Sequence, residues 1–405
     1  EHELTTESEE LYAPRTPRAE VMEKVLADLT FACENLPANW NDGNAPGRLN
    51  KWAALAVKSR ICLFEGTWRK YHGLADANKF LTEAANAAEE LIKNGPHSLY
   101  TGGERPYNTV KRMTDLTGVK EVIYWRKYAT GVEVNHFLNY HRSYNGGATK
   151  SAVEDYLCTD GLPITLSNLY KGDEVYENIF ENRDPRLRQT VMHPADQPYY
   201  MMGNSTGKPT DVYPRIKGMS GGQSSSTGYH VIKIFEVNAS YAGYNSSTTP
   251  VITLAYPEVL LNYAEAKAEL GTLDQAGLDM SINKLRDRVG MPHLTLNPQM
   301  DPRYAHWGVS SLIVEIRRER RVELFMEGFR YDDLRRWKLG KELEKKSYGM
   351  RWDDANQSRF DPTKKATVKT GLVDGIPYLE PYKGTDYENP KFEEPKHYLW
   401  PIPLN

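Results

Sequence analysis

Apolar residues recur at helical spacing towards both ends of the chain, and this pattern predicts a helical scaffold. In the N-terminal part the spacing indicates helices over residues 18–36, 48–66 and 76–93, of which the second and third form a pair rich in alanine. A second pair is predicted over residues 257–270 and 275–289, with a glycine-containing turn between its helices. Small residues in both pairs allow the helices to approach closely.

Both pairs carry the residue pattern of a helical repeat. The run YAEAKAELGTLDQAGLDMSINKLR, which begins at Tyr263, resembles a tetratricopeptide unit, and Trp52-x-x-Leu55-Ala56 echoes the start of the same repeat. We expect Gly66 to break the chain between the helices of the first pair. Because the copies lie far apart in sequence, we expect the two pairs to pack together in space rather than to form a continuous solenoid.

The stretch from Glu315 to Trp337 combines dense charge with an apolar stripe, and it predicts one helix followed by a second short helix. The stripe consists of Leu312, Ile316, Leu324, Phe325 and Phe329. We expect Gly328 to end the first helix in a left-handed conformation. Since buried charges normally persist only when they are paired, the Arg and Glu residues here indicate structural ion pairs rather than a catalytic cluster.

Specific ion pairs can be predicted from spacing. Two pairs stand three residues apart on the charged helix, namely Glu315 with Arg318 and Arg320 with Glu323. We expect the members of each pair to meet on the helix surface. Arg286 and Arg288 could bind an anion, but such residues more often pair with carboxylates, and we expect this pairing across the fold. Asp184, which Pro185 biases away from helical conformation, is expected to accept hydrogen bonds from nearby backbone or arginine.

The chain between the helical parts has a different composition. Residues 96–250 are rich in Gly, Asn, Ser, Thr and Tyr, and short apolar runs at 121–125 and 229–235 predict strands. Residues 340–395 form a second irregular stretch. We therefore predict a mainly α fold in a single domain of residues 1–405. In this division a tetratricopeptide-like scaffold comprises residues 17–95 and 251–340, and loop-rich ligand-binding and capping regions that contain short strands comprise residues 96–250 and 341–405.

Composition and motifs exclude several classes of function. A formal net charge of −3 provides no basic field for nucleic acid, and the sequence contains no run of eighteen apolar residues that would span a membrane. No GxSxG, HExxH or P-loop motif occurs. The histidines and the three cysteines show no metal-binding spacing, so we expect no metal, no cofactor and no catalytic residue. Arginine neighbours would keep Glu319 and Glu323 ionised, which is unsuitable for a general acid.

Several runs resemble landmarks of the SusD/RagB family, and they stand in the order that the family has. These runs are GRLNKWAALAVKSRICLFEG, DYLCTDGLPI, ENRDPRL, TLAYPEVLLNYAEAKAELG, INKLRDRVGMP, RRERRVELFMEGFRYDDLRRW and YLWPIP. The resemblance implies a non-catalytic nutrient-binding lipoprotein on the extracellular face of the outer membrane. It also implies capture of a glycan and a SusC-like TonB-dependent transporter as partner. Because the chain opens on EHELTTESEE, we expect the N-terminal part of the family fold, with its lipid anchor, to be absent from this sequence.

The resemblance places the ligand surface on insertion loops but fixes no residue there. Aromatic faces stack on sugar rings, and polar side chains bond to hydroxyl groups, so we selected loop clusters that combine both. The candidates are Tyr140, His141, Tyr144, Asn145, Tyr199, Tyr200, Asn204, Tyr241 and Tyr244. The same tyrosines could instead pack the loops onto the helices. A peptide or another oligomeric nutrient is an alternative ligand, and a tetratricopeptide adaptor or a glycoside hydrolase is an alternative function.

Overall fold

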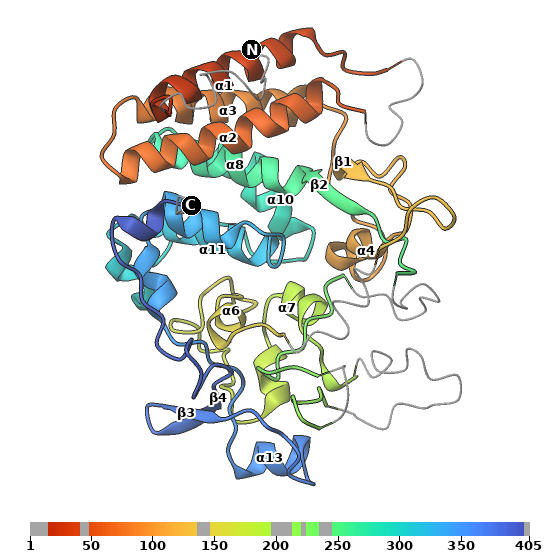
Figure 1. The fold of residues 1–405 in the computed structure, drawn as a ribbon, viewed down its shortest axis with the longest axis vertical. Coiled ribbons are helices and arrows are strands. Elements are labelled where there is room, and N and C mark those ends of the chain that lie inside the picture. Colours follow the sequence, from red (N-terminus) through yellow and green to blue (C-terminus); the bar gives the residue numbers. More distant parts are fainter. Residues whose placement is uncertain are drawn as a thin grey trace, which may run out of the picture.

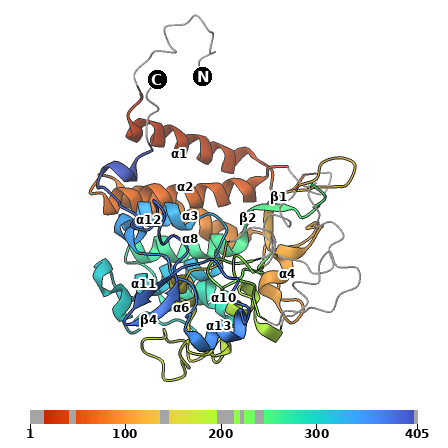
Figure 2. The same ribbon diagram turned by 60° about the horizontal axis from the view of Figure 1, so that its bottom comes forward.

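Helices from both ends of the chain form one layered scaffold (Figures 1 and 2). The computed structural model describes residues 15–40, 48–135, 146–195, 213–219, 224–234 and 245–400. The N-terminal helices are α1 (Arg18–Asn35), α2 (Lys51–Tyr71) and α3 (Ala77–Asn94). The scaffold helices of the C-terminal half are α8 (Tyr256–Glu269), α9 (Gln275–Met280), α10 (Ile282–Asp287), α11 (Ser311–Glu323) and α12 (Arg330–Arg336). The fold is mainly helical, as predicted.

The helix pair α2 and α3 shows why one prediction fails. The side chain of Asn50 accepts a hydrogen bond from the Ala53 amide (3.0 Å) and so caps the start of α2. The helix then continues past Gly66 to Tyr71, so the expected break at Gly66 is wrong. A Cβ atom at Gly66 would lie 2.7 Å from Leu81 Cγ and 2.8 Å from the Leu81 backbone nitrogen. The glycine therefore allows close approach of α3 rather than a turn.

The two helical parts share one hydrophobic core. Helix α8 packs against α2, α3 and α11, and α12 packs against α2. This core contains Trp52, Leu55, Leu91, Leu260, Leu285 and Ile316, all buried. The predicted helix over residues 275–289 is divided at Ser281, whose hydroxyl donates to the carbonyl of Gly277 (2.5 Å). A serine that bonds back to its own helix competes with the regular backbone pattern, and here Ser281 leaves the helical conformation, with φ of −125° and ψ of −92°.

Strands are few and short. Strand β1 (Val122–Arg126) pairs antiparallel with β2 (Val251–Ala255), which confirms the strand predicted near residues 121–125. The strand predicted over 229–235 is wrong in its described part, residues 229–234, where Val231 makes only an isolated bridge to Val191. Tyr229 and Val231 of that run are buried in a core, and an apolar run by itself does not specify a strand.

The C-terminal region packs onto the insertion, and α6, α7, α13, β3 and β4 lie in the lower half of the molecule (Figure 1). The helices of the insertion are α4 (Pro106–Arg112), α6 (Lys150–Glu154) and α7 (Pro185–Thr190), and the C-terminal region contains α13 (Asp354–Phe360), β3 (Thr370–Val373) and β4 (Ile376–Leu379). One core joins Tyr176 and Tyr229 of the insertion to Trp352, Phe360 and Leu379 of the C-terminal region. The predicted boundaries between scaffold and loop-rich segments remain a prediction.

Helix α11 ends earlier than expected. The Ser310 hydroxyl accepts from the Ile313 amide (3.3 Å) and caps its start, and the helix closes at Glu323. Gly328 has the predicted left-handed conformation, with φ of 90°, but it lies beyond the helix in the loop before α12, where Met326 is also left-handed with φ of 59°. This irregular loop positions the residues of the candidate site. None of the helices in the described ranges combines the length and apolar character needed to cross a bilayer.

Candidate functional site

A buried network of ion pairs links α11 to the insertion. Arg186 of α7 donates from Nη1 to Glu319 Oε1 (2.6 Å) and to Glu323 Oε2 (3.0 Å), and from Nη2 to Asp184 Oδ2 (2.7 Å). Asp184 also accepts from the Arg186 amide (2.9 Å), which confirms the hydrogen bonding predicted for this carboxylate and caps the start of α7. Because all these groups are buried and paired, their arrangement stabilises the junction and leaves no free acid for catalysis.

Most charged residues of α11 form ion pairs with residues outside this helix. The predicted pair of Glu315 and Arg318 is confirmed at 3.2 Å. The predicted pair of Arg320 and Glu323 is wrong. Arg320 instead binds Asp333 of α12 (2.9 Å), because α11 is surrounded by other elements that bring acidic groups to it.

Arg286 of α10 and Arg288 bind the same two carboxylates as Arg186, and this confirms the predicted pairing across the fold. Arg286 Nε donates to Glu319 Oε2 (3.0 Å), and Arg288 Nη2 donates to Glu323 Oε1 (2.6 Å). Burial opposes ionisation of Glu323, but the guanidinium groups of Arg288 and Arg186 outweigh it and lower the pKa of this carboxyl group. Glu323 is therefore an ionised structural group.

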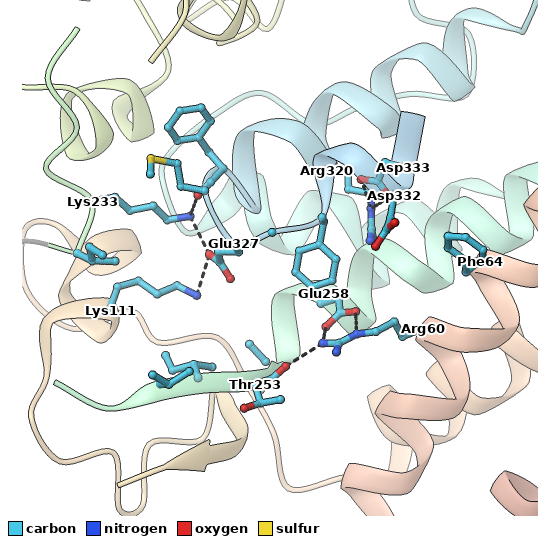
Figure 3. A pocket seen from close by; sticks show the side chains of 18 of the residues that line it. Arg60, Phe64, Lys111, Lys233, Thr253, Glu258, Arg320, Glu327, Asp332 and Asp333 are labelled. Carbon is cyan, nitrogen blue, oxygen red and sulfur yellow. Dashed lines mark hydrogen bonds and ion pairs between the residues drawn. The ribbon is translucent and has the colours of Figure 1, made fainter. Parts of the chain in front are cut away.

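A cavity of about 630 Å³ opens where the scaffold meets the insertion (Figure 3). Its walls come from α2, α4, β2, α8, α11, α12, the loop between α11 and α12, and the insertion residues near Val231. The charged lining residues are Arg60, Lys111, Lys233, Glu258, Arg320, Glu327, Asp332, Asp333 and Arg336. Apolar side chains, among them Phe64 and Phe329, line the rest.

On one side of the cavity two lysines point at a single carboxylate (Figure 3). Glu327 Oε1 lies 2.9 Å from Lys111 Nζ and 2.7 Å from Lys233 Nζ. Burial opposes ionisation of Glu327, yet the two ammonium groups prevail and lower its pKa to about 2. Lys233 also donates to the carbonyls of Glu323 (3.0 Å) and Phe325 (2.9 Å), so all three of its donors are used.

On the other side of the cavity Arg60 and Glu258 form a bidentate ion pair (Figure 3). Arg60 Nε lies 2.6 Å from Glu258 Oε1, and Arg60 Nη2 lies 2.5 Å from Glu258 Oε2. The same Nη2 donates to the carbonyl of Thr253 (2.8 Å). The guanidinium carbons of Arg60 and Arg320 lie 5.1 and 5.2 Å from the centroid of the Phe329 ring.

This lining suits binding rather than bond cleavage. The carboxylates Glu258 and Glu327 form ion pairs with Arg60 and Lys233, respectively. Within the described ranges no group of three or more His, Cys, Asp or Glu side chains could hold a metal ion. With its charges paired and apolar side chains between them, the cavity can accept an uncharged ligand that has both apolar and polar faces.

The nine residues predicted from sequence to contact ligand all lie outside the described residues. These are Tyr140, His141, Tyr144, Asn145, Tyr199, Tyr200, Asn204, Tyr241 and Tyr244. The sequence did not predict a ligand site at the cavity, although Arg60, Glu258 and Glu327 stand within runs that resemble family landmarks. Lys111 stands in none of them. Only the fold brings it to Glu327, so no local signal could have identified it.

Comparison with known proteins gives one consistent result. The SusD family matches residues 120–405. The chain is 24% identical over 332 residues to the SusD-like protein P2 of Formosa agariphila, which corresponds to 81% of this chain and 58% of that protein. The chain therefore spans less than two thirds of the length of this curated relative.

Solved structures show the same mainly helical fold. A SusD-like carbohydrate binding protein from Bacteroides fragilis has a TM-score of 0.72 and 23% identity, and the match covers 99% of this chain and 72% of that one. A second SusD-like protein from the same organism has a TM-score of 0.67 and 25% identity, with 98% and 70% covered. A third protein, crystallised with a xylogluco-oligosaccharide, has a TM-score of 0.53 and 17% identity, with 98% and 73% covered.

Proposed function

Because the chain belongs to the SusD family of non-catalytic binding proteins, we propose that it captures an oligo- or polysaccharide and delivers it to a SusC-like TonB-dependent transporter. The family match over residues 120–405 carries this proposal. One similar structure is described as carbohydrate binding, and another was crystallised with a xylogluco-oligosaccharide. Members of this family are typically lipoproteins of the outer-membrane surface. We accordingly place this protein at the extracellular face, held by an N-terminal lipid anchor.

Binding in this proposal requires no chemical step. Sugar rings stack on aromatic faces, and their hydroxyl groups bond to polar side chains. Two parts of the molecule are candidates for these contacts. One is the cavity between scaffold and insertion, where Phe329 offers a ring among paired charges. The other is the set of tyrosine-rich loop clusters in the region 96–250, which we retain as the proposed ligand-binding surface.

Affinity electrophoresis with a panel of plant, algal and microbial polysaccharides tests this function. We expect at least one polysaccharide to retard the protein, with no reducing sugar released on prolonged incubation. Release of reducing sugar would contradict a binding role. Absence of retardation by every glycan, together with retention on an immobilised peptide library, would favour a peptide ligand.

Variants then distinguish the two candidate surfaces. Phe329→Leu keeps an apolar side chain in the cavity but removes its aromatic face, whereas Tyr140→Ala and Tyr241→Ala alter the loop clusters. Val132→Ala is a matched control because this side chain is 88% exposed and lies outside the cavity. The surface that holds the glycan is the one whose variants weaken retardation while the control retains it.

A further inference from the structure

Two exposed tyrosines stand together far along the chain from the loop clusters. Tyr382 is 48% exposed and Tyr387 is 72% exposed. Their ring centroids lie 6.3 Å apart with an angle of 64° between the ring planes. Both rings line a hollow of about 400 Å³, which they share with Lys345, Ser347 and Glu388 and which contains no residue of the cavity in Figure 3. Large apolar rings that remain exposed beside a hollow are typical of a binding surface.

The loop that carries the two rings is held firmly in place. The Thr385 amide and hydroxyl both donate to the carbonyl of Tyr382, at 3.0 and 2.6 Å. Gly384 has a φ of 76°, which favours glycine, and its amide donates to Glu388 Oε2 (2.8 Å). Lys346 Nζ lies 3.3 Å from Glu388 Oε1. Because the backbone is already fixed, a ligand would lose little free energy in ordering this loop.

Ion pairs in and around the hollow indicate the chemistry of the ligand. Lys345 pairs with Glu342 (2.7 Å). Glu380, which is buried, and Glu388 both pair with Lys346, at 3.0 and 3.3 Å. Lys383 Nζ also lies 3.9 Å from Glu380 Oε2, so three lysines stand beside these three carboxylates, and the lining favours neither an anion nor a cation. The two rings offer flat apolar faces, and the ionised groups on the rim can bond to hydroxyl groups, a combination that fits an uncharged sugar chain.

We propose that Tyr382 and Tyr387 form a second saccharide-binding surface, which holds a neutral segment of the same glycan chain at a distance from the principal site. This inference rests on the proposed function, since it assumes a glycan ligand. Two sites that bind one polymer raise the overall affinity by making the second contact intramolecular. A short oligosaccharide that reaches only one site would not gain from it.

The double variant Tyr382→Ala/Tyr387→Ala tests the second surface. We expect its affinity for the best polysaccharide of the panel, measured by isothermal titration, to fall at least about tenfold. We expect the affinity for a short oligosaccharide of the same glycan to change less than about twofold. Tyr382→Phe/Tyr387→Phe, which keeps both rings, is expected to retain most of the polymer affinity. Leu372→Ala is the control, because this side chain is 69% exposed on the neighbouring hairpin but does not line the hollow.

The outcomes separate the two proposals. Unchanged polymer affinity in the alanine double variant would overturn the second surface and leave the proposed function intact. An equal loss for polymer and short oligosaccharide would also overturn it, since the tyrosines would then belong to the principal site. If the unaltered protein bound no glycan, both proposals would fall. Both rings are exposed, so the variants are expected to fold, and unchanged melting temperatures would verify this.

Discussion

Lys233 of the insertion binds Glu327 of the loop that follows α11, with 2.7 Å between Nζ and Oε1. The same ammonium group caps the C-terminal end of α11 through the carbonyls of Glu323 and Phe325. A cation at this end of a helix satisfies carbonyls that lack a partner within the helix and interacts favourably with the helix dipole. Lys233 therefore joins the two halves of the molecule at the wall of the cavity.

Replacing this lysine should destabilise the protein strongly. Lys233→Met keeps the length of the side chain but leaves the Glu323 and Phe325 carbonyls without this donor and Glu327 with Lys111 as its remaining lysine. We expect the free energy of unfolding to fall by about 3–5 kcal/mol, as measured by urea denaturation. Lys396→Met is the matched control, because the Lys396 side chain is 72% exposed and a surface ion pair contributes about 0–1 kcal/mol. Equal stabilities for the two variants would contradict the role assigned to Lys233.

Whether Gly66→Ala raises or lowers the free energy of unfolding tests how closely α2 and α3 pack. In the interior of an unhindered helix, Gly→Ala stabilises by about 0.5–1 kcal/mol. At position 66 the new Cβ would approach the Leu81 backbone nitrogen to 2.8 Å, and the backbone cannot rotate away as a side chain can. We therefore expect Gly66→Ala to lower the free energy of unfolding by about 1–3 kcal/mol. Lys24→Ala on the exposed face of α1 should change it little, and a more stable Gly66→Ala protein would show that α2 and α3 lie further apart.

The lowered pKa of Glu327, which lines the cavity, predicts that the protein loses stability in acid. The pKa of Glu327 is about 2 in the folded protein, below its ordinary value of 4.5, so the unfolded chain takes up a proton first as the pH falls. Stability from this group is complete above about pH 5 and is lost between about pH 5 and pH 2. Glu327→Gln should be less stable than the unaltered protein at pH 7. The difference in unfolding free energy, measured in urea at each pH, should narrow towards pH 2, and a constant difference would refute this linkage.

The helices could be predicted from sequence because their signal is local. The spacing of apolar residues gives α3 within one residue at each end, and the charged run identifies α11 and α12 as a buried helical pair. What sequence could not give depends on distant contacts. Gly66 is indistinguishable from a helix breaker until Leu81 is known to lie against it. Likewise, Arg320 has a suitable partner three residues away but binds Asp333, because α12 brings a second carboxylate closer.

The candidate site likewise depends on contacts between residues that lie far apart in the sequence. The cavity draws its charged residues from separate segments of the chain, and Lys111 meets Glu327 only because α4 lies beside the loop after α11. The tyrosine clusters chosen from loop composition lie outside the described residues, so they remain a prediction. Tyr382 and Tyr387 were not among the candidates, although they stand in the predicted loop-rich region 341–405, and their exposure is a property of the folded loop.

Because the charges in the cavity and around the hollow beside Tyr382 and Tyr387 are paired, we can predict how glycan affinity depends on salt concentration. If the ligand is an uncharged glycan, its binding replaces contacts with water by stacking and hydrogen bonds, and no counterions are released. Screening at high salt weakens interactions between exposed charges, but the cavity pairs of Arg60 with Glu258 and of Lys233 with Glu327 are intramolecular and at least partly buried. We expect the dissociation constant for the best polysaccharide to change less than about threefold between roughly 50 and 500 mM NaCl. A tenfold or larger weakening would instead indicate an acidic or sulfated glycan, and it would overturn the neutral class that we assign to the ligand.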